Sequence, residues 1–119
     1  MKVNYNTLWR SQFWLLWLGV TAILLVPAEY IGSPVFDWWD KAQHGLVFFV
    51  LTISAYLAYS SKLRWILIGL FLFGGVIELL QSVTGWRQGD LFDWLADAIG
   101  VVVAYFGLCL FSGRQTLHW

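Results

Sequence analysis

Charge is what this sequence has least of. Only 12% of its 119 residues are charged and 60% are hydrophobic, whereas a typical soluble domain has about 25% charged and about 45–50% apolar residues. A chain of this length has no single core large enough to bury that excess, so the composition excludes an ordinary soluble domain and predicts an integral membrane protein. Nine Trp and nine Phe fit this class, because aromatic residues collect at the two lipid–water interfaces.

Cysteine is also scarce, since Cys109 is the only one and cannot form an internal disulfide. Internal repeats and low-complexity tracts are lacking, which favours one domain over residues 1–119. The apolar runs are long and lack the alternation of β-barrel strands. We therefore predict an all-α polytopic membrane protein, an antiparallel bundle of four transmembrane helices. The predicted spans cover about residues 12–29, 40–59, 63–82 and 91–111.

The basic residues predict how this bundle is oriented. With a cytoplasmic N-terminus, five of the seven basic residues fall on the inner side, as the positive-inside rule expects. The inner residues are Lys2, Arg10, Lys62, Arg64 and Arg114, and the outer residues are Lys41 and Arg87. All seven acidic residues fall on the outer side. We therefore expect both termini in the cytoplasm and a polar site that faces outward.

Polar side chains gather near the outer ends of three of these segments. Helical spacing puts Asp93 and Asp97 on one face of the last segment, and Glu78 and Gln81 on one face of the segment before it. His44 lies near the start of the second segment. Lipid cannot solvate such faces, so we expect them to meet inside the bundle. At 1.5 Å per residue, Glu78 and Asp97 both lie roughly 9–10 Å inward, which predicts a shared pocket.

These residues have expected roles in catalysis, binding and metal coordination. The candidate acids and bases are Glu78, Asp93 and His44. The candidate substrate-binding residues are Lys41, Gln81, Arg87 and Asp97. A divalent cation is a possible cofactor, with ligands among Glu78, Asp93, Asp97 and His44, although carboxylates with one histidine specify no particular metal. No Ser or Cys nucleophile stands beside His44, so the sequence leaves open whether the protein is an enzyme.

Other polar and small residues in this region have structural interpretations. Asp40 and Asp90 are placed to cap the second and fourth helices. Gly74, Gly75 and Gly100 are expected to let neighbouring helices approach closely, as small residues do in membranes.

Three patches, in this order, resemble the VanZ-like family of small bacterial membrane proteins. Asp40-Lys41-Ala42-Gln43-His44 is similar to the family's D-K-x-x-H, and Glu78-Leu79-Leu80-Gln81 is similar to its E-x-x-Q. The series Arg87, Asp90, Asp93 and Gly100 is similar to its arginine–aspartate–aspartate–glycine pattern. The family usually has asparagine where this chain has Asp97, so this chain adds a possible charge there.

The resemblance implies a multi-pass protein of the bacterial cytoplasmic membrane with a role in the cell envelope. The family's named member is associated with resistance to the glycopeptide teicoplanin, but the family supplies no defined reaction. We expect the pocket to bind or process an anionic lipid-linked or cell-wall component, with the lipid bilayer as partner and no nucleic acid.

Other functions remain open at this stage. In one, the protein is a non-catalytic accessory or structural membrane protein whose acids lock the helices through Lys41, Arg87 and His44. In another, the acids form a cation-binding site. Ion or proton movement is the least favoured function, because the inner halves of the spans lack polar groups along a path.

Overall fold

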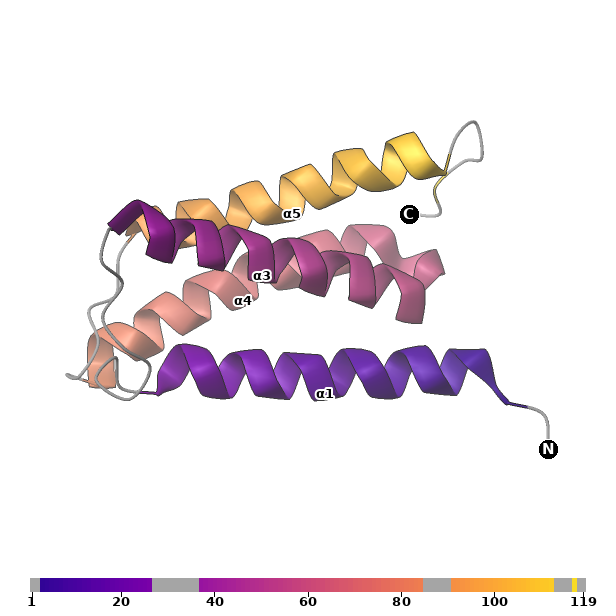
Figure 1. Ribbon diagram of the computed structural model, residues 1–119, viewed down its shortest axis with the longest axis horizontal. Coiled ribbons are helices and arrows are strands. Elements are labelled where there is room, and N and C mark those ends of the chain that lie inside the picture. Colours follow the sequence, from indigo (N-terminus) through magenta and orange to yellow (C-terminus); the bar gives the residue numbers. More distant parts are fainter. Residues whose placement is uncertain (1–2, 27–36, 85–90, 113–116, 118–119) are drawn as a thin grey trace.

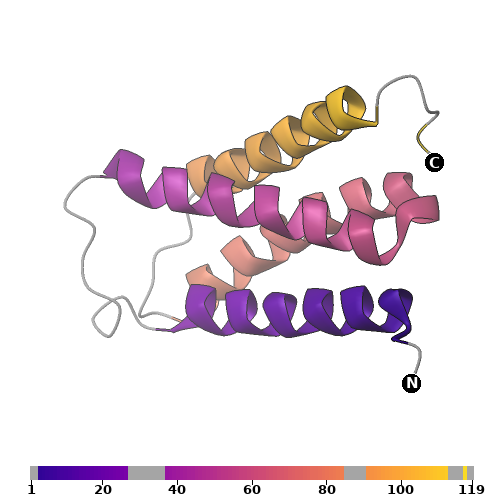
Figure 2. The ribbon, with the colours of Figure 1, turned by 45° about the vertical axis from the view of Figure 1, so that its right-hand side comes forward.

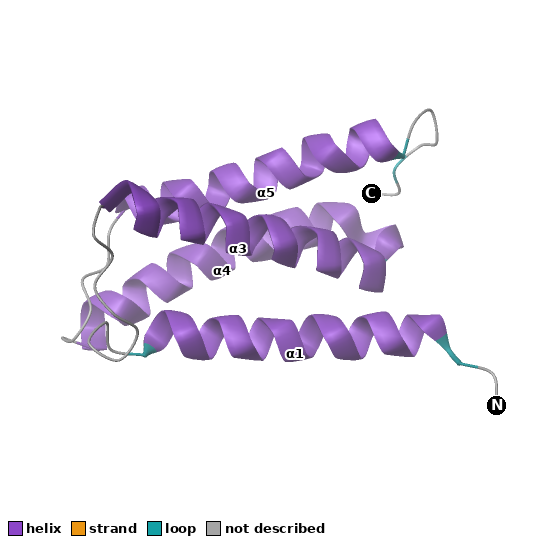
Figure 3. Cartoon of the chain, in the orientation of Figure 1, coloured by secondary structure: helices purple, strands orange, loops and turns teal. Residues whose placement is uncertain are grey.

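The computed structural model describes residues 3–26, 37–84, 91–112 and 117, and this part of the chain is almost entirely helical (Figures 1 and 3). It contains four α-helices and a short 3₁₀ turn, with no strand among the described residues. These elements are α1 (Tyr5–Leu25), α3 (Asp37–Ala58), η1 (Ser60–Lys62), α4 (Leu63–Thr84) and α5 (Leu91–Phe111). The predicted all-α bundle is confirmed.

The four helices run antiparallel along one common direction (Figures 1 and 2). The start of α1 and the end of α5, which lead to the two chain termini, lie at the same end of the bundle, on the right of Figure 1. Helix α3 occupies the centre of the contacts, because it packs most extensively against α5 and also against α1 and α4. This arrangement places the start of α3, the end of α4 and the start of α5 together at the end away from the termini.

Three segments have the length and hydropathy of membrane spans: α1, η1 with α4 (Ser60–Thr84), and α5. Helix α3 is equally long, at 22 residues, but its first turns contain Asp37, Asp40 and Lys41. Its central position helps a less apolar helix fit in the bundle, because its polar residues His44, Thr52 and Ser54 are buried against the other helices. Large apolar side chains on the other helices face outward, as expected for a surface in contact with lipid.

Two helix starts differ from the predicted spans. Helix α1 begins at Tyr5, well before the predicted residue 12, because the Asn4 side chain caps it by accepting hydrogen bonds from the backbone of Asn6 (3.1 Å) and Thr7 (3.4 Å). Helix α3 begins at Asp37. Asp40 therefore lies inside the first turn, and its predicted role as the N-cap is wrong.

The remaining boundaries lie close to the predicted ones. Helix α4 starts at Leu63 and continues to Thr84, just past the predicted residue 82. Helix α5 spans Leu91–Phe111, which is the predicted range. The other predicted cap, Asp90, lies outside the described residues.

The interior of the bundle is a contiguous apolar core. Phe48 and Leu51 of α3 are fully buried in it, together with Ile77 of α4. Phe73 stacks on Phe48 with ring centroids 5.8 Å apart and contacts Trp17 of α1 at 5.4 Å. Because lipid is as apolar as these side chains, close packing rather than exclusion of water holds them together.

A pair of glycines sets how closely α3 and α5 approach. A Cβ built on Gly100 would overlap the backbone carbonyl of Gly45, so no side chain fits there. On the other side of α5, Gly74 and Gly75 leave space for the Trp94 ring, which an added Cβ would meet at 3.0–3.1 Å. The predicted packing role of the three glycines is confirmed. The close approach has a further consequence, since His44 precedes Gly45 and Asp97 lies one turn before Gly100.

Candidate functional site

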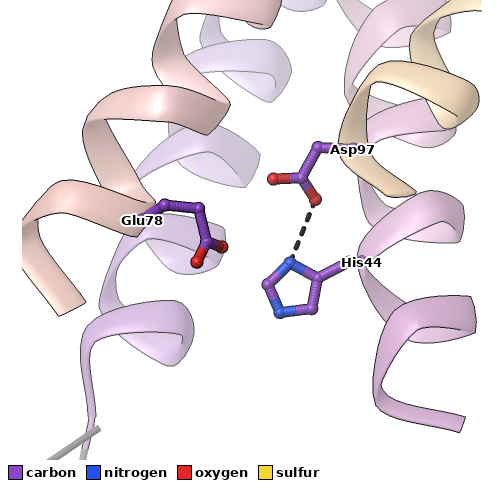
Figure 4. Close-up of side chains that lie close together, drawn as sticks. All are labelled: His44, Glu78 and Asp97. Atoms are coloured by element: carbon purple, nitrogen blue, oxygen red, sulfur yellow. Dashed lines mark hydrogen bonds and ion pairs between the residues drawn. The ribbon is translucent and has the colours of Figure 1, made fainter. Parts of the chain in front are cut away.

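Three titratable side chains from three different helices converge inside the bundle (Figure 4). They are His44 of α3, Glu78 of α4 and Asp97 of α5, with exposed fractions of only 2%, 6% and 0%. One nitrogen of His44 and one carboxylate oxygen of each acid all lie within 4.8 Å of one another. We call this group the His–Glu–Asp cluster.

The His44–Asp97 contact fixes the orientation of the imidazole. His44 Nδ1 lies 3.0 Å from Asp97 Oδ1, and both side chains are buried. An ionised carboxylate only accepts hydrogen bonds, so Nδ1 is the donor in this pair. That assignment directs the ring's other nitrogen, Nε2, away from Asp97, and it defines the tautomer when His44 is neutral.

Glu78 reaches the same space from α4. Its carboxylate points toward the His44–Asp97 pair in Figure 4. Gly74, one turn earlier on the same face of α4, makes room for this approach, because a Cβ there would lie 3.1 Å from Asp97 Oδ2. The missing side chain at Gly74 therefore brings the backbone of α4 close to the Asp97 carboxylate.

Lys41 and Asp93 form a second polar pair on the same two helices as His44 and Asp97. Lys41 Nζ lies 3.3 Å from Asp93 Oδ1, with side-chain exposures of 31% and 8%. This pair is about one helical turn nearer the helix ends than the His–Glu–Asp cluster. Asp93, predicted as an acid or base, is thus engaged by Lys41, and Asp97 is the aspartate beside His44.

Gln81 is buried, at 1% exposure, and ties α4 to the end of α1. Its Nε2 donates a 2.7 Å hydrogen bond to the carbonyl oxygen of Leu24. The structure thus places this predicted substrate-binding residue in a contact between helices. Arg87, the remaining predicted binding residue, lies outside the described residues.

The depth of the cluster agrees between the helices. His44 lies seven residues after Asp37, Asp97 six residues after Leu91, and Glu78 six residues before Thr84. These separations correspond to roughly 9–10 Å from the helix ends that lie away from the chain termini.

The cluster has an excess of acid over base. Burying a carboxylate away from water is expensive unless a cation or hydrogen bonds compensate it. The cluster contains one imidazole and two carboxylates. When both acids are ionised, even a protonated His44 leaves a net charge of one negative unit. Such a group can take up a cation or exchange protons with a bound molecule.

Trp94 is a residue of the site's wall that sequence reasoning missed. Its indole Nε1 donates a 2.9 Å hydrogen bond to the carbonyl oxygen of Phe71, and its ring lies 5.1 Å from that of Phe71. Trp94 thereby closes the seam between α4 and α5 next to the cluster. The Gly74–Gly75 pair was the signal in the sequence, because adjacent glycines on a helix leave room for a large ring on a neighbouring one.

An apolar groove of about 360 Å³ continues along the α4–α5 seam from Phe71 toward the ends that carry the chain termini. It starts at the level of the cluster along α5, since Ala98 directly follows Asp97. Its lining residues are Leu67, Ile68, Phe71, Ala98, Val101, Val102 and Tyr105.

Comparisons with known proteins agree with this fold and these motifs. The chain is 31% identical over 108 residues to an uncharacterized protein of Schizosaccharomyces pombe, an alignment that covers 82% of this chain and 65% of the relative. The chain thus spans just under two thirds of that relative's length. No solved structure matches. The model of the VanZ/LLP1 family matches residues 3–112, nearly the whole sequence. This chain therefore belongs to the VanZ/LLP1 family.

Proposed function

We propose that this protein binds and processes an anionic, lipid-linked component of the cell envelope in a pocket that opens at the outer face of the membrane. The observation that carries the proposal is the convergence of His44, Glu78 and Asp97 within 4.8 Å from three separate helices. Ionisable residues inside a membrane bundle are costly, by roughly 2.5–3.5 kcal/mol for an aspartate at the centre of a helix on insertion scales, and they commonly mark functional sites.

The α4–α5 groove supports a ligand with a lipid tail. The groove is lined almost entirely by apolar atoms and lies between two helices of membrane-spanning character. It begins at the level of Asp97 and extends along α5 to Tyr105, roughly 12 Å at the helical rise. A hydrocarbon chain in this groove places its polar head at the level of the cluster.

The relative from fission yeast also favours a lipid over a bacterial cell-wall polymer. A phosphate ester on a lipid is chemistry that bacterial and fungal membranes share. We therefore favour a lipid-linked phosphate or carboxylate as the ligand.

The described side chains suggest acid–base chemistry. Asp97 orients His44 through the 3.0 Å contact, and an imidazole held in this way can accept a proton from a bound hydroxyl or water. Glu78 faces the same space and can deliver a proton to a leaving oxygen. Lys41 lies about one helical turn from the cluster, and Arg87 is the other basic residue on the predicted outer side, so we assign both to the outer edge of an anionic head group and not to the cluster itself.

We assign the protein to the bacterial cytoplasmic membrane, with both termini in the cytoplasm. Arg10, Lys62 and Arg64 lie on α1, η1 and α4 at the end of the bundle that holds the chain termini. The positive-inside rule puts that end in the cytoplasm and the His–Glu–Asp cluster toward the outer face.

A structural role is the second candidate, and one observation favours it. The Lys41–Asp93 and His44–Asp97 pairs both join α3 to α5, which is the most extensively packed pair of helices. In this alternative the acids lock the two helices and bind nothing.

Mass spectrometry of co-purifying lipid separates the two functions. We expect wild-type protein to retain an anionic lipid that Glu78→Gln loses, because Glu78 joins neither α3–α5 pair. Ser54→Ala is the control, since Ser54 is a buried polar residue that bonds Gln12 at 2.6 Å outside the site. Equal lipid content in all three proteins would contradict the proposal and favour the structural role.

A further inference from the structure

An anionic ligand and an acidic pocket conflict electrostatically. Glu78 and Asp97 contribute two carboxylates to the cluster, and His44 contributes at most one positive charge. The nearest described cation, Lys41, is engaged by Asp93 at 3.3 Å. A phosphate or carboxylate brought to this cluster therefore meets negative charge, unless a further cation accompanies it.

We propose that His44, Glu78 and Asp97 bind one divalent transition-metal ion, of which Zn²⁺ is the representative. The binding of the ion stands on the three side chains alone, whereas its role toward a lipid head group rests on the proposed function.

The distances in the cluster fit a single ion after a small movement of Glu78. Ligands with bonds of about 2.0–2.2 Å on a tetrahedral ion lie roughly 3.4 Å from one another. His44 Nδ1 and Asp97 Oδ1 are already 3.0 Å apart. The whole cluster lies within 4.8 Å, so the third ligand must approach by up to about 1.4 Å, which rotation about the side-chain bonds of Glu78 can supply.

In the metal-bound form, the ion takes the place of the hydrogen between Nδ1 and Oδ1, so His44 and Glu78 act as ligands there and the acid–base roles proposed above belong to the metal-free protein. The Nδ1 lone pair then binds the metal, and Nε2 carries the ring's one proton: a neutral His44 shifts its proton from Nδ1 to Nε2, and a protonated His44 releases the Nδ1 proton to solvent. Figure 4 shows that the Glu78 carboxylate faces this position from the opposite helix.

The donor set selects the class of metal. Mg²⁺ and Ca²⁺ prefer oxygen ligands throughout, whereas Zn²⁺ accepts one imidazole with two carboxylates. Three protein ligands also leave one coordination position open, which is the pattern of catalytic zinc sites. A phosphate or carboxylate oxygen, or a water molecule, can occupy that position.

The ion removes the electrostatic conflict. Its two positive charges balance the carboxylates of Glu78 and Asp97, so the pocket no longer repels an anion. Ala98, which lines the groove, follows Asp97 in α5, so the groove and the three ligands share one level of the bundle. The site then recognises both the charge and the tail of the ligand.

Calorimetric titration of ZnCl₂ into the full-length protein, stripped of metal by a chelator and kept in lipid-free detergent, tests the proposal. We expect one site with a Kd in the micromolar range or tighter, and no comparable heat from MgCl₂. Glu78→Gln and His44→Gln should each weaken zinc binding by at least tenfold.

Three matched variants exclude other sources of zinc binding. Asp93→Asn removes an acidic side chain of α5 that lies outside the cluster and pairs with Lys41. His118→Ala and Cys109→Ser remove the other histidine and the one cysteine of the sequence. All three should keep the wild-type affinity. Loss of binding in His118→Ala or Cys109→Ser, or the absence of zinc binding in wild type, would overturn the proposal.

The visible absorption spectrum of bound Co²⁺ tests which side chains ligate the metal, and it does so independently of any effect of the substitutions on protein stability. Wild-type protein should give the intense bands of a four-coordinate site, and Glu78→Gln should lose them while its circular dichroism stays helical. An unchanged cobalt spectrum in folded Glu78→Gln would contradict the assigned ligand set.

The lipid measurement and the zinc measurement test the two proposals independently. Stoichiometric zinc binding with equal lipid in wild type and Glu78→Gln supports the metal site and refutes the proposed function. Lipid loss in Glu78→Gln without any zinc binding to wild type refutes the metal site and leaves the proposed function standing.

Discussion

At the scale of single residues, the Lys41–Asp93 ion pair shows what a partly exposed polar contact contributes. Asp93 is nearly buried, whereas Lys41 is about one third exposed. Replacing Lys41 by Met removes the positive charge that lies 3.3 Å from the buried Asp93 carboxylate. We expect Lys41→Met to lower the free energy of unfolding by about 1–3 kcal/mol, a value reduced from that of a fully buried pair by solvent screening.

Reversible unfolding in mixed micelles measures this effect, and a double variant controls it. Lys41→Met with Asp93→Leu removes both charges and should recover most of the lost stability, because no buried charge is left. If Lys41→Met alone is as stable as wild type, the ion pair does not stabilise the α3–α5 contact.

Residue-level reasoning from the sequence identified the polar residues of the site but not how they pair. Helical spacing placed Asp93 and Asp97 on one face of α5, and both do point into the bundle. Which of them meets His44 depends on the offset between α3 and α5. That offset follows from the Gly45–Gly100 contact, which no periodicity in a single helix reveals.

At the scale of helices, the glycine contact between α3 and α5 predicts a sharp contrast within one helix. A methyl group at Gly100 must displace the backbone of Gly45, whereas one at Gly107 meets no atom within 4 Å. We expect Gly100→Ala to lower the free energy of unfolding by roughly 1–3 kcal/mol through overpacking.

Gly107→Ala is the control on the same helix. It should be neutral or raise stability by up to about 1 kcal/mol, because Ala is the better helix former. Thermal unfolding of both variants in the same detergent compares them directly, and equal melting temperatures would show that α3 and α5 do not meet at Gly100.

The extent of the helices was predictable to different degrees. The end of α5 follows from the apolar run that reaches Phe111, and its start was placed directly after Asp90, the predicted cap. The starts of α1 and α3 were placed too late, because each begins in a polar stretch that hydropathy assigns to a loop. Capping by Asn4 holds the first turn of α1 in helical form.

At the scale of the whole molecule, the bundle places the start of α1 and the end of α5 on one side. In a background without Cys109, Lys62→Cys reports the side of the termini, and Leu91→Cys, at a residue 76% exposed, reports the opposite side. We expect an impermeant thiol reagent added to intact cells to label Leu91→Cys but not Lys62→Cys. The reverse pattern would place the termini outside.

Composition and the long apolar runs were sufficient to predict a helical membrane protein, because 60% of the residues are hydrophobic and the runs lack the alternation of barrel strands. The order of helices around the central α3 was not predictable. It depends on long-range contacts such as the Gln81–Leu24 hydrogen bond and the Phe48–Phe73 stack, whose partners lie far apart in the sequence.

The central claim is that His44, Glu78 and Asp97 form a binding site and not a lock between helices. Thermal unfolding of wild type and Glu78→Gln in detergent, each with and without ZnCl₂ and an anionic phospholipid, tests it most directly. Sites for ligands are commonly built at a cost in stability. We predict that Glu78→Gln melts at or above the wild-type temperature and loses the upward shift that zinc and lipid give wild type. A variant that melts well below wild type, or that keeps the full shift, would contradict the claim.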